Sequence, residues 1–298
     1  MSEIETYRAQ ARAWLESVAP KYARAARGKL KLSVEEDLAL GREYMAAKHD
    51  AGYAGINWPT EIGGQGLSNM HKIAFDAEEM QFGMPNVYFG ISLGMPIPIL
   101  IHYGQDRAWV KERVIKALRG EEIWCQLFSE PSGGSDLAAL RTKAEPDGNG
   151  WRMTGQKIWT SWAQYCDYGV IVVRTDPTVE KHKGLTYFWV DMKAEGVEVR
   201  PIKLAGGDSH VNEVFFDAVR LEDSQRMGEV GVAFVVLREQ PATTVAELQA
   251  FCSQGLARFK VPRHVIPMAV EDIPVTPSGR ARKFLLVQKA LALLGLNT

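Results

Sequence analysis

The segment over residues 124–136 holds the residue types in this sequence that best suit ligand binding. It reads WCQLFSEPSGGSD, a strand-like apolar run that enters a loop with two glycines between serines. Glycine lets backbone N–H groups approach a flat or anionic ligand without a Cβ in the way, and serine hydroxyls add hydrogen-bond donors. These residues favour a loop that holds a cofactor; a plain turn between two domains is the alternative.

A second segment, residues 157–162, reads KIWTSW. It places the ring of Trp159 next to the hydroxyls of Thr160 and Ser161 on a predicted strand. These groups suit contact with a flat ligand. The alternative is that Trp159 belongs to the hydrophobic core.

Other common functional motifs are absent from the sequence. The six histidines never lie three or four residues apart and none neighbours a cysteine, so we expect no metal site. There is no GxxxxGK[ST] loop and no strand-linked GxGxxG. The residues alone therefore identify no catalytic group.

Helices with short breaks are predicted for residues 1–120. One helix is predicted within residues 106–120, where four apolar residues repeat at helical spacing before Gly120, a residue typical of helix ends. These four are Val110, Val114, Ala117 and Leu118. A second helix is predicted after Ser68, which is placed to cap it, with acidic residues on one face and an apolar face opposite. The apolar face consists of Met70, Ile73, Ala74, Ala77 and Met80.

The pattern changes to short β-rich runs over residues 121–226, separated by turn sequences such as PDGNG and AGGD. Since no helical pattern intervenes, we predict an antiparallel β-barrel or sandwich. Residues 227–298 then read as a small α+β unit, with a strand at AFVVLR, a capping box from Thr244 to Glu247, a helix that stops at Pro262, and a last helix over residues 282–294. The predicted fold class is therefore α+β in three domains.

Composition restricts the partners and the location. The chain has 35 basic and 36 acidic residues, so its net charge of −1 predicts no nucleic-acid partner. The uncharged span over residues 81–105 contains three prolines, which favours a buried, interrupted segment and no membrane insertion. Three well-separated cysteines and a start without a basic, apolar leader indicate a cytoplasmic protein.

Three motifs together resemble the acyl-CoA dehydrogenase family. The family's loop T/S-E-P-x-x-G-S-D is matched by SEPSGGSD at residues 129–136, and its flavin strand W-x-[TS] by WTS at residues 159–161. Residues 57–68, NWPTEIGGQGLS, are similar to the family's P-x-x-x-G-G-x-G-x-S segment. The motifs occur in the family's order, and the resemblance covers residues 1–228.

This resemblance implies FAD as the cofactor, bound against the middle domain. It assigns the edge of the isoalloxazine ring to a set of backbone and hydroxyl groups from Gln126, Leu127, Phe128, Ser129, Gly134 and Ser135. Trp159, Thr160 and Ser161 would cover the ring and hydrogen-bond it, and Ser135 would also touch the CoA part of an acyl-CoA substrate. The segment over residues 87–101 would line the acyl-chain pocket.

In the family, a carboxylate removes the α-proton of the thioester while a hydride leaves from the β-carbon to the flavin, and an electron-transfer flavoprotein is the expected partner. That base belongs to a third, helical-bundle domain, so the catalytic residue of this chain is unknown. The carboxylates of Glu247, Glu271 and Asp272 are present in the tail, where ordinary solvated charges are expected.

The tail instead resembles the C-terminal domain of acyl-CoA ligases, the adenylate-forming family. The matching runs are GEVGVAFVV at residues 228–236, RFKVP at 258–262 and PVTPSGRARK at 274–283. In the last run the family has a lysine that contacts the acyl substrate, and this chain has Arg280, whose fork-shaped guanidinium is a different donor. Ligase activity is therefore not expected.

The sequence thus predicts an FAD-dependent acyl-CoA dehydrogenase whose activity is impaired because the base is not supplied by this chain. The alternative is a non-catalytic flavin- and acyl-CoA-binding chimera. In both cases the apolar surface that a bundle domain would cover should drive self-association or docking of the amphipathic tail helices on that face.

Overall fold

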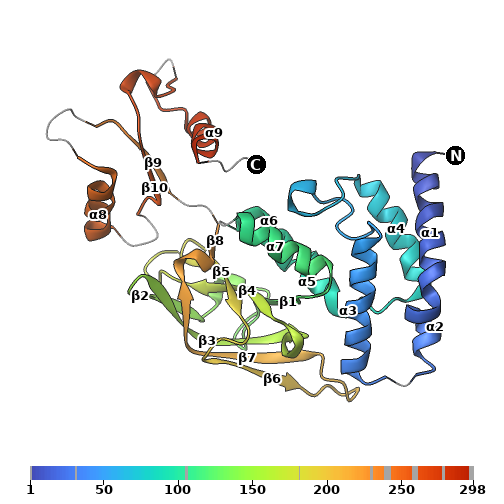
Figure 1. The fold of residues 1–298 in the computed structure, drawn as a ribbon. Coiled ribbons are helices and arrows are strands. Elements are labelled where there is room, and N and C mark those ends of the chain that lie inside the picture. The colour runs from blue at the N-terminus through green and yellow to red at the C-terminus, as the bar shows by residue number, and fades with distance from the viewer. Residues whose placement is uncertain are drawn as a thin grey trace. The chain divides into compact units, whose positions relative to one another are not determined.

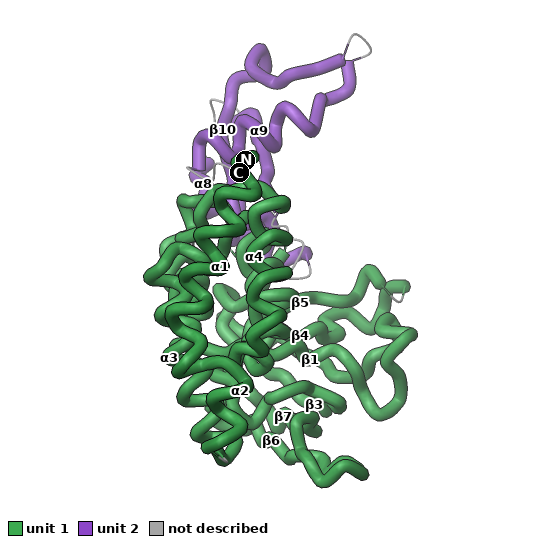
Figure 2. Tube along the Cα trace, turned by 90° about the vertical axis from the view of Figure 1, so that its right-hand side faces the viewer, with its two compact units in different colours: residues 1–228 green, residues 229–298 purple. Residues whose placement is uncertain are grey.

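The computed structural model describes residues 2–30, 32–104, 107–180, 182–228, 231–237, 243–256, 261–276 and 279–294. The chain divides into two compact units, residues 1–228 and residues 229–298 (Figure 2). The boundary expected near residue 120 falls inside the larger unit, so the three-domain division stays a prediction.

The larger unit begins with helices that their own sequences cap. α1 (Glu3–Tyr22) and α3 (Val34–Asp50) each start with a capping box, formed by Ser2 with Glu5 and by Ser33 with Glu36. The short α2 (Arg24–Arg27) lies between them, and α1 packs along α4 (Figure 1). The other helices of this part are η1 (Thr60–Ile62), α4 (Asn69–Phe82), η2 (Val87–Phe89), α5 (Gly90–Gly94), α6 (Pro96–Tyr103) and α7 (Arg107–Leu118).

Helix α7 confirms its prediction, because its four periodic apolar side chains are all buried and the chain turns at Gly120 with φ of 69°. Helix α4 forms as predicted, but its faces are largely reversed: of the predicted apolar face only Ala74 is buried and Ala77 partly buried. Met70, Ile73 and Met80 are exposed, Met80 to 81%, whereas the acidic Glu78 and Glu79 are buried.

The buried face of α4 combines the fully buried ring of Phe75 with two carboxylates whose burial is compensated by neighbouring helices. Glu78 accepts from Arg8 of α1 at 2.7 Å and lies 3.3 Å from Arg12, and Glu79 pairs with Lys48 of α3 at 2.7 Å. Three cations on neighbouring helices thus compensate the burial of two carboxylates. Ser68 precedes the helix but does not cap it, since its hydroxyl bonds to Nδ1 of His71 at 2.8 Å.

The uncharged span forms short helical pieces, as its prolines predict. Pro96 stands at the start of α6, where a missing N–H costs nothing, and Ile97 and Leu100 are fully buried. Among the described residues, no helix combines the length and apolar character that crossing a bilayer requires.

The middle part of the unit is a mixed eight-stranded sheet in the order β6-β7-β3-β2-β4-β5-β8, with β1 paired to β4. The β-rich runs of the sequence at residues 151–161, 168–176, 185–192, 197–204 and 211–219 correspond to β3, β4, β5, β6 and β7. Most pairs are antiparallel, but β1 is parallel to β4, and β2 meets β4 in a parallel pairing of Lys143 with Arg174. Over the described strands the path ends at β6 and β8, so no closed barrel forms. The bounds are β1 (Trp124–Leu127), β2 (Lys143–Asp147), β3 (Gly150–Ser161), β4 (Tyr168–Arg174), β5 (Leu185–Asp191), β6 (Val197–Ile202), β7 (Val211–Glu222) and β8 (Arg226–Met227). The 3₁₀ turns are η3 (Leu137–Ala139), η4 (Ala163–Tyr165) and η5 (Asp223–Gln225).

The smaller unit is α+β, as predicted. β9 (Val232–Val235) pairs parallel with β10 (His264–Pro267), and α8 (Val245–Gly255), η7 (Val270–Asp272) and α9 (Lys283–Leu293) complete its described part. The capping box of Thr244 with Glu247 is confirmed, but α8 ends at Gly255, well before Pro262. Residues 257–260, within the helix predicted to stop at Pro262, and residues 277 and 278, within the ligase-like run at 274–283, lie outside the described residues.

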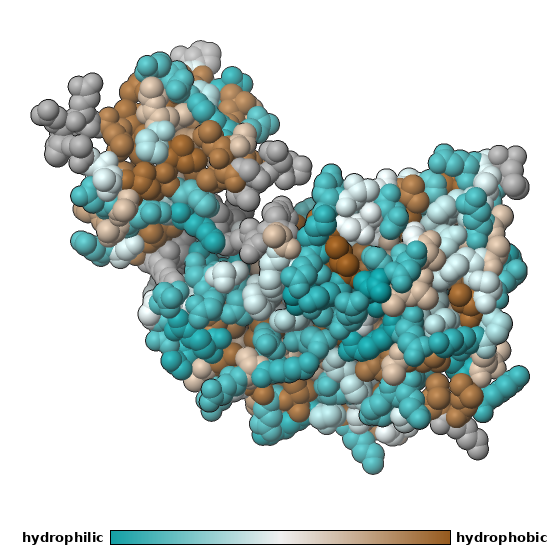
Figure 3. Space-filling model, viewed as in Figure 1, coloured by the Kyte–Doolittle hydropathy of each residue, from teal (hydrophilic) through white to brown (hydrophobic). Residues whose placement is uncertain are grey.

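Few apolar side chains of this unit are buried. Among its described residues these are Val265 and Ala290. Figure 3 shows apolar side chains gathered on the face of this unit toward the viewer. Phe251, Val270 and Phe284 are among its exposed apolar side chains, so its hydrophobic core is small.

Candidate functional site

The structure brings the two segments singled out in the sequence side by side. The backbone N–H of Ile158 donates to the carbonyl of Ser129 at 2.9 Å. The ammonium of Lys157 donates to the carbonyl of Phe128 at 3.1 Å. The chain leaving β1 is therefore bonded to β3 one residue before Trp159.

Trp159 has an unusual backbone and an exposed ring. Its φ is 61°, in the left-handed region that a bulky residue rarely occupies, and its side chain is 57% exposed. It lies where the register of β3 against β7 shifts, between Lys157 and Thr160. The core alternative for Trp159 is therefore wrong. A β-bulge that presents a large ring outward, at a cost in backbone strain, is typical of a binding surface.

Thr160 and Ser161 differ in what they offer. Thr160 is only 2% exposed, and its hydroxyl has no hydrogen-bond partner in the structure, while its carbonyl accepts from Asn212 Nδ2 at 2.9 Å. Ser161 is partly exposed. Of the two hydroxyls that were assigned to the ring of a flavin, the one on Ser161 is the accessible one.

The residues at the end of β1 and just after it also differ in whether their side chains are accessible. The side chain of Leu127 is fully buried, so only its backbone is available to a ligand. Gln126, Phe128 and Ser129 are partly exposed. A cofactor edge placed here would meet backbone groups together with the side chains of these three residues.

The loop that follows is a tight turn. Glu130 and Gly133 exchange two backbone hydrogen bonds, of 2.9 and 3.0 Å, and Gly134 and Ser135 beyond them are exposed. A Cβ on Gly134 would lie 3.4 Å from Ser129 Oγ, an ordinary contact, and Gly134 does not have a positive φ. Nothing within the chain therefore demands glycine at this position, whereas a ligand lying close to the backbone would.

A buried ion pair, not predicted from the sequence, lies under this loop. Lys157 is fully buried, and its Nζ lies 2.9 Å from Oε1 of Glu130. Burial lowers the pKa of the lysine. Burial also raises the pKa of Glu130, but hydrogen bonds from Lys157, Thr142 and Arg141 outweigh it, so that the net pKa is lowered. The signal was available, since Lys157 has the same strand parity as the buried Trp151 and Met153.

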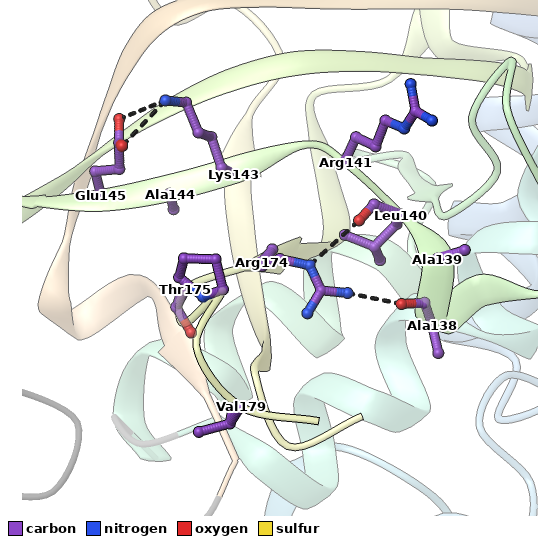
Figure 4. A pocket seen from close by; sticks show the side chains of 11 residues that line it. Ala138, Ala139, Leu140, Arg141, Lys143, Ala144, Glu145, Arg174, Thr175 and Val179 are labelled. Carbon is purple, nitrogen blue, oxygen red and sulfur yellow. Dashed lines mark hydrogen bonds and ion pairs between the residues drawn. The ribbon is translucent and has the colours of Figure 1, made fainter. Parts of the chain in front are cut away.

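A cavity of about 520 Å³ opens beside the end of the loop (Figure 4). Its lining includes three basic residues, Arg141, Lys143 and Arg174. The guanidinium of Arg174 donates to the carbonyl of Ala138 at 2.6 Å, so it holds the chain that follows Ser135. In Figure 4 the side chain of Arg141 extends away from these two residues.

Of the three tail carboxylates, Glu247 has a local role. Its carboxylate accepts from the backbone N–H of Thr244 at 2.8 Å, and the hydrogen bonds with Thr244 lower its pKa. Glu271 and Asp272 lie on η7 and are exposed. All three belong to the smaller unit. Across the described residues, no group of three His, Cys, Asp or Glu side chains is arranged to hold a metal ion.

Comparison with known families gives three matches along the chain. Residues 1–122 match the acyl-CoA dehydrogenase N-terminal domain, and residues 125–219 match the acyl-CoA dehydrogenase middle domain. Residues 209–280 match the AMP-binding enzyme C-terminal domain. The larger unit therefore belongs to the acyl-CoA dehydrogenase family, a family of flavoprotein oxidoreductases, and the smaller unit carries a segment of the ligase type.

Individual relatives agree with this family. The chain is 36% identical over 272 residues to acyl-CoA dehydrogenase FadE34 of Mycobacterium tuberculosis, which covers 90% of this chain and 37% of that protein. It is 35% identical over 237 residues to acyl-CoA dehydrogenase IpdE1 of the same organism, covering 78% of this chain and 60% of that one. The chain thus spans between about a third and three fifths of the length of these relatives.

Two solved structures share the fold. The ChsE4-ChsE5 complex from Mycobacterium tuberculosis superposes with a TM-score of 0.65 at 31% identity, covering 77% of this chain and 56% of that one. The Tcur3481-Tcur3483 steroid acyl-CoA dehydrogenase gives a TM-score of 0.62 at 29% identity, covering 76% of this chain and 57% of that one. The helical N-terminal part and the mixed sheet are the dehydrogenase fold.

Proposed function

We propose that the larger unit binds FAD against the bulge at Trp159 and the loop over residues 126–135, and that it uses this flavin in α,β-dehydrogenation of an acyl-CoA thioester. The observation that carries the proposal is the exposed, strained Trp159 beside a loop whose glycine the chain itself does not require. The relatives bear the same family name, which supports the assignment.

In this arrangement the chain's own groups bind and orient. The ring of Trp159 covers one face of the isoalloxazine, and the Ser161 hydroxyl and the backbone of Gln126 to Ser129 hydrogen-bond its edge. Ser135, exposed at the end of the loop, contacts the CoA part of the substrate. FAD, when bound, supplies the acceptor for the hydride that leaves the β-carbon.

Among the described residues, we assign none as the catalytic base. Removal of the α-proton requires a positioned carboxylate, and general-base help typically contributes ~10²–10⁴-fold to rate. Glu247 is occupied by its own helix cap. We therefore propose that the chain alone dehydrogenates acyl-CoA very slowly, and that a second chain supplies the base.

The test of binding is a fluorescence titration of FAD with the apo-protein. Quenching of flavin fluorescence that saturates in the micromolar range supports the site, and weak, easily lost binding is expected because the middle domain supplies only one side of it. No quenching at high micromolar protein contradicts the proposal.

The test of chemistry is anaerobic mixing of the FAD-loaded protein with acyl-CoAs of short, long and ring-bearing acyl groups, with flavin bleaching as the readout. Slow or absent bleaching is expected. Bleaching near ~1–10³ per second, the range of ordinary enzymes, would show that a base is present after all. Substituting Glu247, Glu271 and Asp272 singly would then identify it.

The alternative function is a non-catalytic flavin- and acyl-CoA-binding protein. The engagement of Glu247 in its capping box favours it. Saturable binding of flavin and of acyl-CoA without bleaching, even after addition of partner chains, would select this alternative.

Further proposals concern partners and location. The exposed stripe of Met70, Ile73 and Met80 on α4 supports self-association, and sedimentation should show assemblies that Ile73→Lys disrupts. An electron-transfer flavoprotein remains the proposed electron acceptor. All three cysteines are free, which supports work in a reducing compartment such as the cytoplasm.

A further inference from the structure

The ion pair of Glu130 with Lys157 lies beneath the candidate flavin surface and joins its two halves. Lys157 Nζ contacts both Glu130 Oε1, at 2.9 Å, and the Phe128 carbonyl, at 3.1 Å. Both side chains are almost entirely buried, with exposures of 0% and 4%. The lysine stands on β3 and the glutamate at the first turn of the loop.

The carboxylate of Glu130 also closes the far end of the loop. It accepts from the backbone N–H of Arg141 at 2.6 Å and from that of Thr142 at 2.9 Å. Thr142 in turn donates from its hydroxyl to the Gln156 carbonyl at 3.2 Å. One carboxylate thus links the start of the loop, the end of the loop and strand β3.

This pair is costly to keep for stability alone. Two charges lose their hydration on burial, and replacement of a buried ion pair by apolar residues of similar size is often neutral or stabilising. Such pairs are better explained where a particular geometry has to be fixed. The geometry fixed here is the position of the loop against the bulge, because Ile158, next to Lys157, is bonded to Ser129, and Trp159 follows directly.

We propose that Glu130 and Lys157 are positioning residues that hold the loop over residues 128–142 against strand β3, so that the backbone edge and the ring of Trp159 are placed for the flavin before it binds. The proposal rests on the proposed function for its ligand. Neither side chain touches that ligand, since both are buried beneath the loop.

The test uses the full chain and the double variant Glu130→Gln/Lys157→Met, which removes both charges and keeps the shapes. The matched control is Glu79→Gln/Lys48→Met, which removes a buried pair of 2.7 Å between α3 and α4. Hydrogen exchange of the loop amides is measured without ligand, urea unfolding reports global stability, and flavin titration reports binding.

We expect the double variant to unfold near the wild-type urea midpoint, to exchange its loop amides at least about tenfold faster, and to bind flavin about tenfold more weakly, which corresponds to about 1.4 kcal/mol. The control should leave loop exchange and flavin affinity unchanged. Lys157→Arg, which keeps a buried cation, should recover part of the affinity.

Wild-type protection of the loop in the double variant would overturn the proposal, as would equal acceleration of loop exchange in the control. Unchanged flavin affinity in the double variant would do the same. Failure of the wild-type chain to bind flavin would instead defeat the proposed function, and the ligand-free exchange experiment would still decide whether the pair positions the loop.

Discussion

The ring of Tyr88 meets the ring of Trp162 edge to face, with centroids 4.7 Å apart and an interplanar angle of 62°. Tyr88 lies in η2, at the start of the uncharged apolar segment, and Trp162 directly follows β3. The contact therefore ties the helical part of the unit to the strand that bears Trp159. Tyr88 also donates to Asp37 of α3 at 3.3 Å.

Alkaline pH should weaken this unit. Burial and the charge of Asp37 raise the pKa of Tyr88 to about 12, and burial raises that of Tyr7 to about 12. An unfolded tyrosine titrates near pH 10. The folded chain holds these protons more tightly, so their contribution to stability is complete below about pH 10 and is lost as pH rises from 10 to 12.

This pH dependence is measured by urea unfolding from neutral pH to about pH 11. Tyr88→Phe should flatten the alkaline decline, whatever it does to stability at neutral pH. Tyr103→Phe, at an exposed position, is the control and should keep the wild-type slope. Equal slopes for wild type and Tyr88→Phe would contradict the prediction.

The left-handed backbone at Trp159 predicts that the glycine variant is more stable than the alanine variant. Left-handed backbone costs an L-residue about 1–2 kcal/mol, and glycine avoids this cost. Trp159→Gly should therefore be more stable to urea than Trp159→Ala, by about 1 kcal/mol. Both variants should lose flavin affinity, since both lack the ring. An alanine variant as stable as the glycine variant would show that the bulge relaxes.

Because Glu78 of α4 is buried and Met80 is exposed, substitution of Glu78 should lower the free energy of unfolding more than substitution of Met80. Glu78→Ala removes a carboxylate that is 3% exposed and paired with Arg8 and Arg12, so it should cost about 2 kcal/mol. Met80→Lys changes an exposed side chain and should stay within about 0.5 kcal/mol of wild type. Chemical denaturation measures both. If Met80→Lys cost more stability than Glu78→Ala, the apolar face of α4 would be the buried one and this prediction would be wrong.

Limited proteolysis should remove the smaller unit first. Its buried apolar side chains, among the described residues, are Val265 and Ala290, whereas the larger unit has two extensive hydrophobic clusters. Local opening is easier where few apolar contacts are lost. Mass spectrometry of a mild digest should find a persistent fragment that ends near Gly228. Early cuts within the sheet would contradict this expectation.

The sequence predicted the elements well where the local pattern and the packing agree. Helix α7 follows its apolar periodicity, strands β3 to β7 form where the β-rich runs lie, and the capping box at Thr244 appears as expected. The buried face of α4 was predicted wrongly because it joins Phe75 to two carboxylates, and the burial of those carboxylates depends on cations distant in sequence. These cations are Arg8, Arg12 and Lys48. A periodicity count within one helix does not include those cations.

In the candidate site, too, the features set by neighbouring residues were predicted from the sequence, and those set by distant residues were not. The motifs at residues 129–136 and 159–161 are local and were found, and the structure places them together. The pairing of Glu130 with Lys157 is 27 residues apart in sequence and depends on the contact between the loop and β3. The parallel pairing of β1 with β4 likewise depends on the whole sheet, which is why an antiparallel sheet was expected.

The place of β7 bears on how such a chain tolerates recombination. The ligase-type match starts at residue 209, yet β7 is hydrogen-bonded on one side to β3 and on the other to β6. A crossover upstream of residue 209 would deprive both neighbours of their partner, whereas a crossover after Met227, the last residue paired with β5, leaves every ladder of the sheet whole. The overlap of the two family matches over residues 209–219 therefore falls on sequence that the dehydrogenase sheet requires, and the connection after Gly228 is where one tail can be exchanged for another.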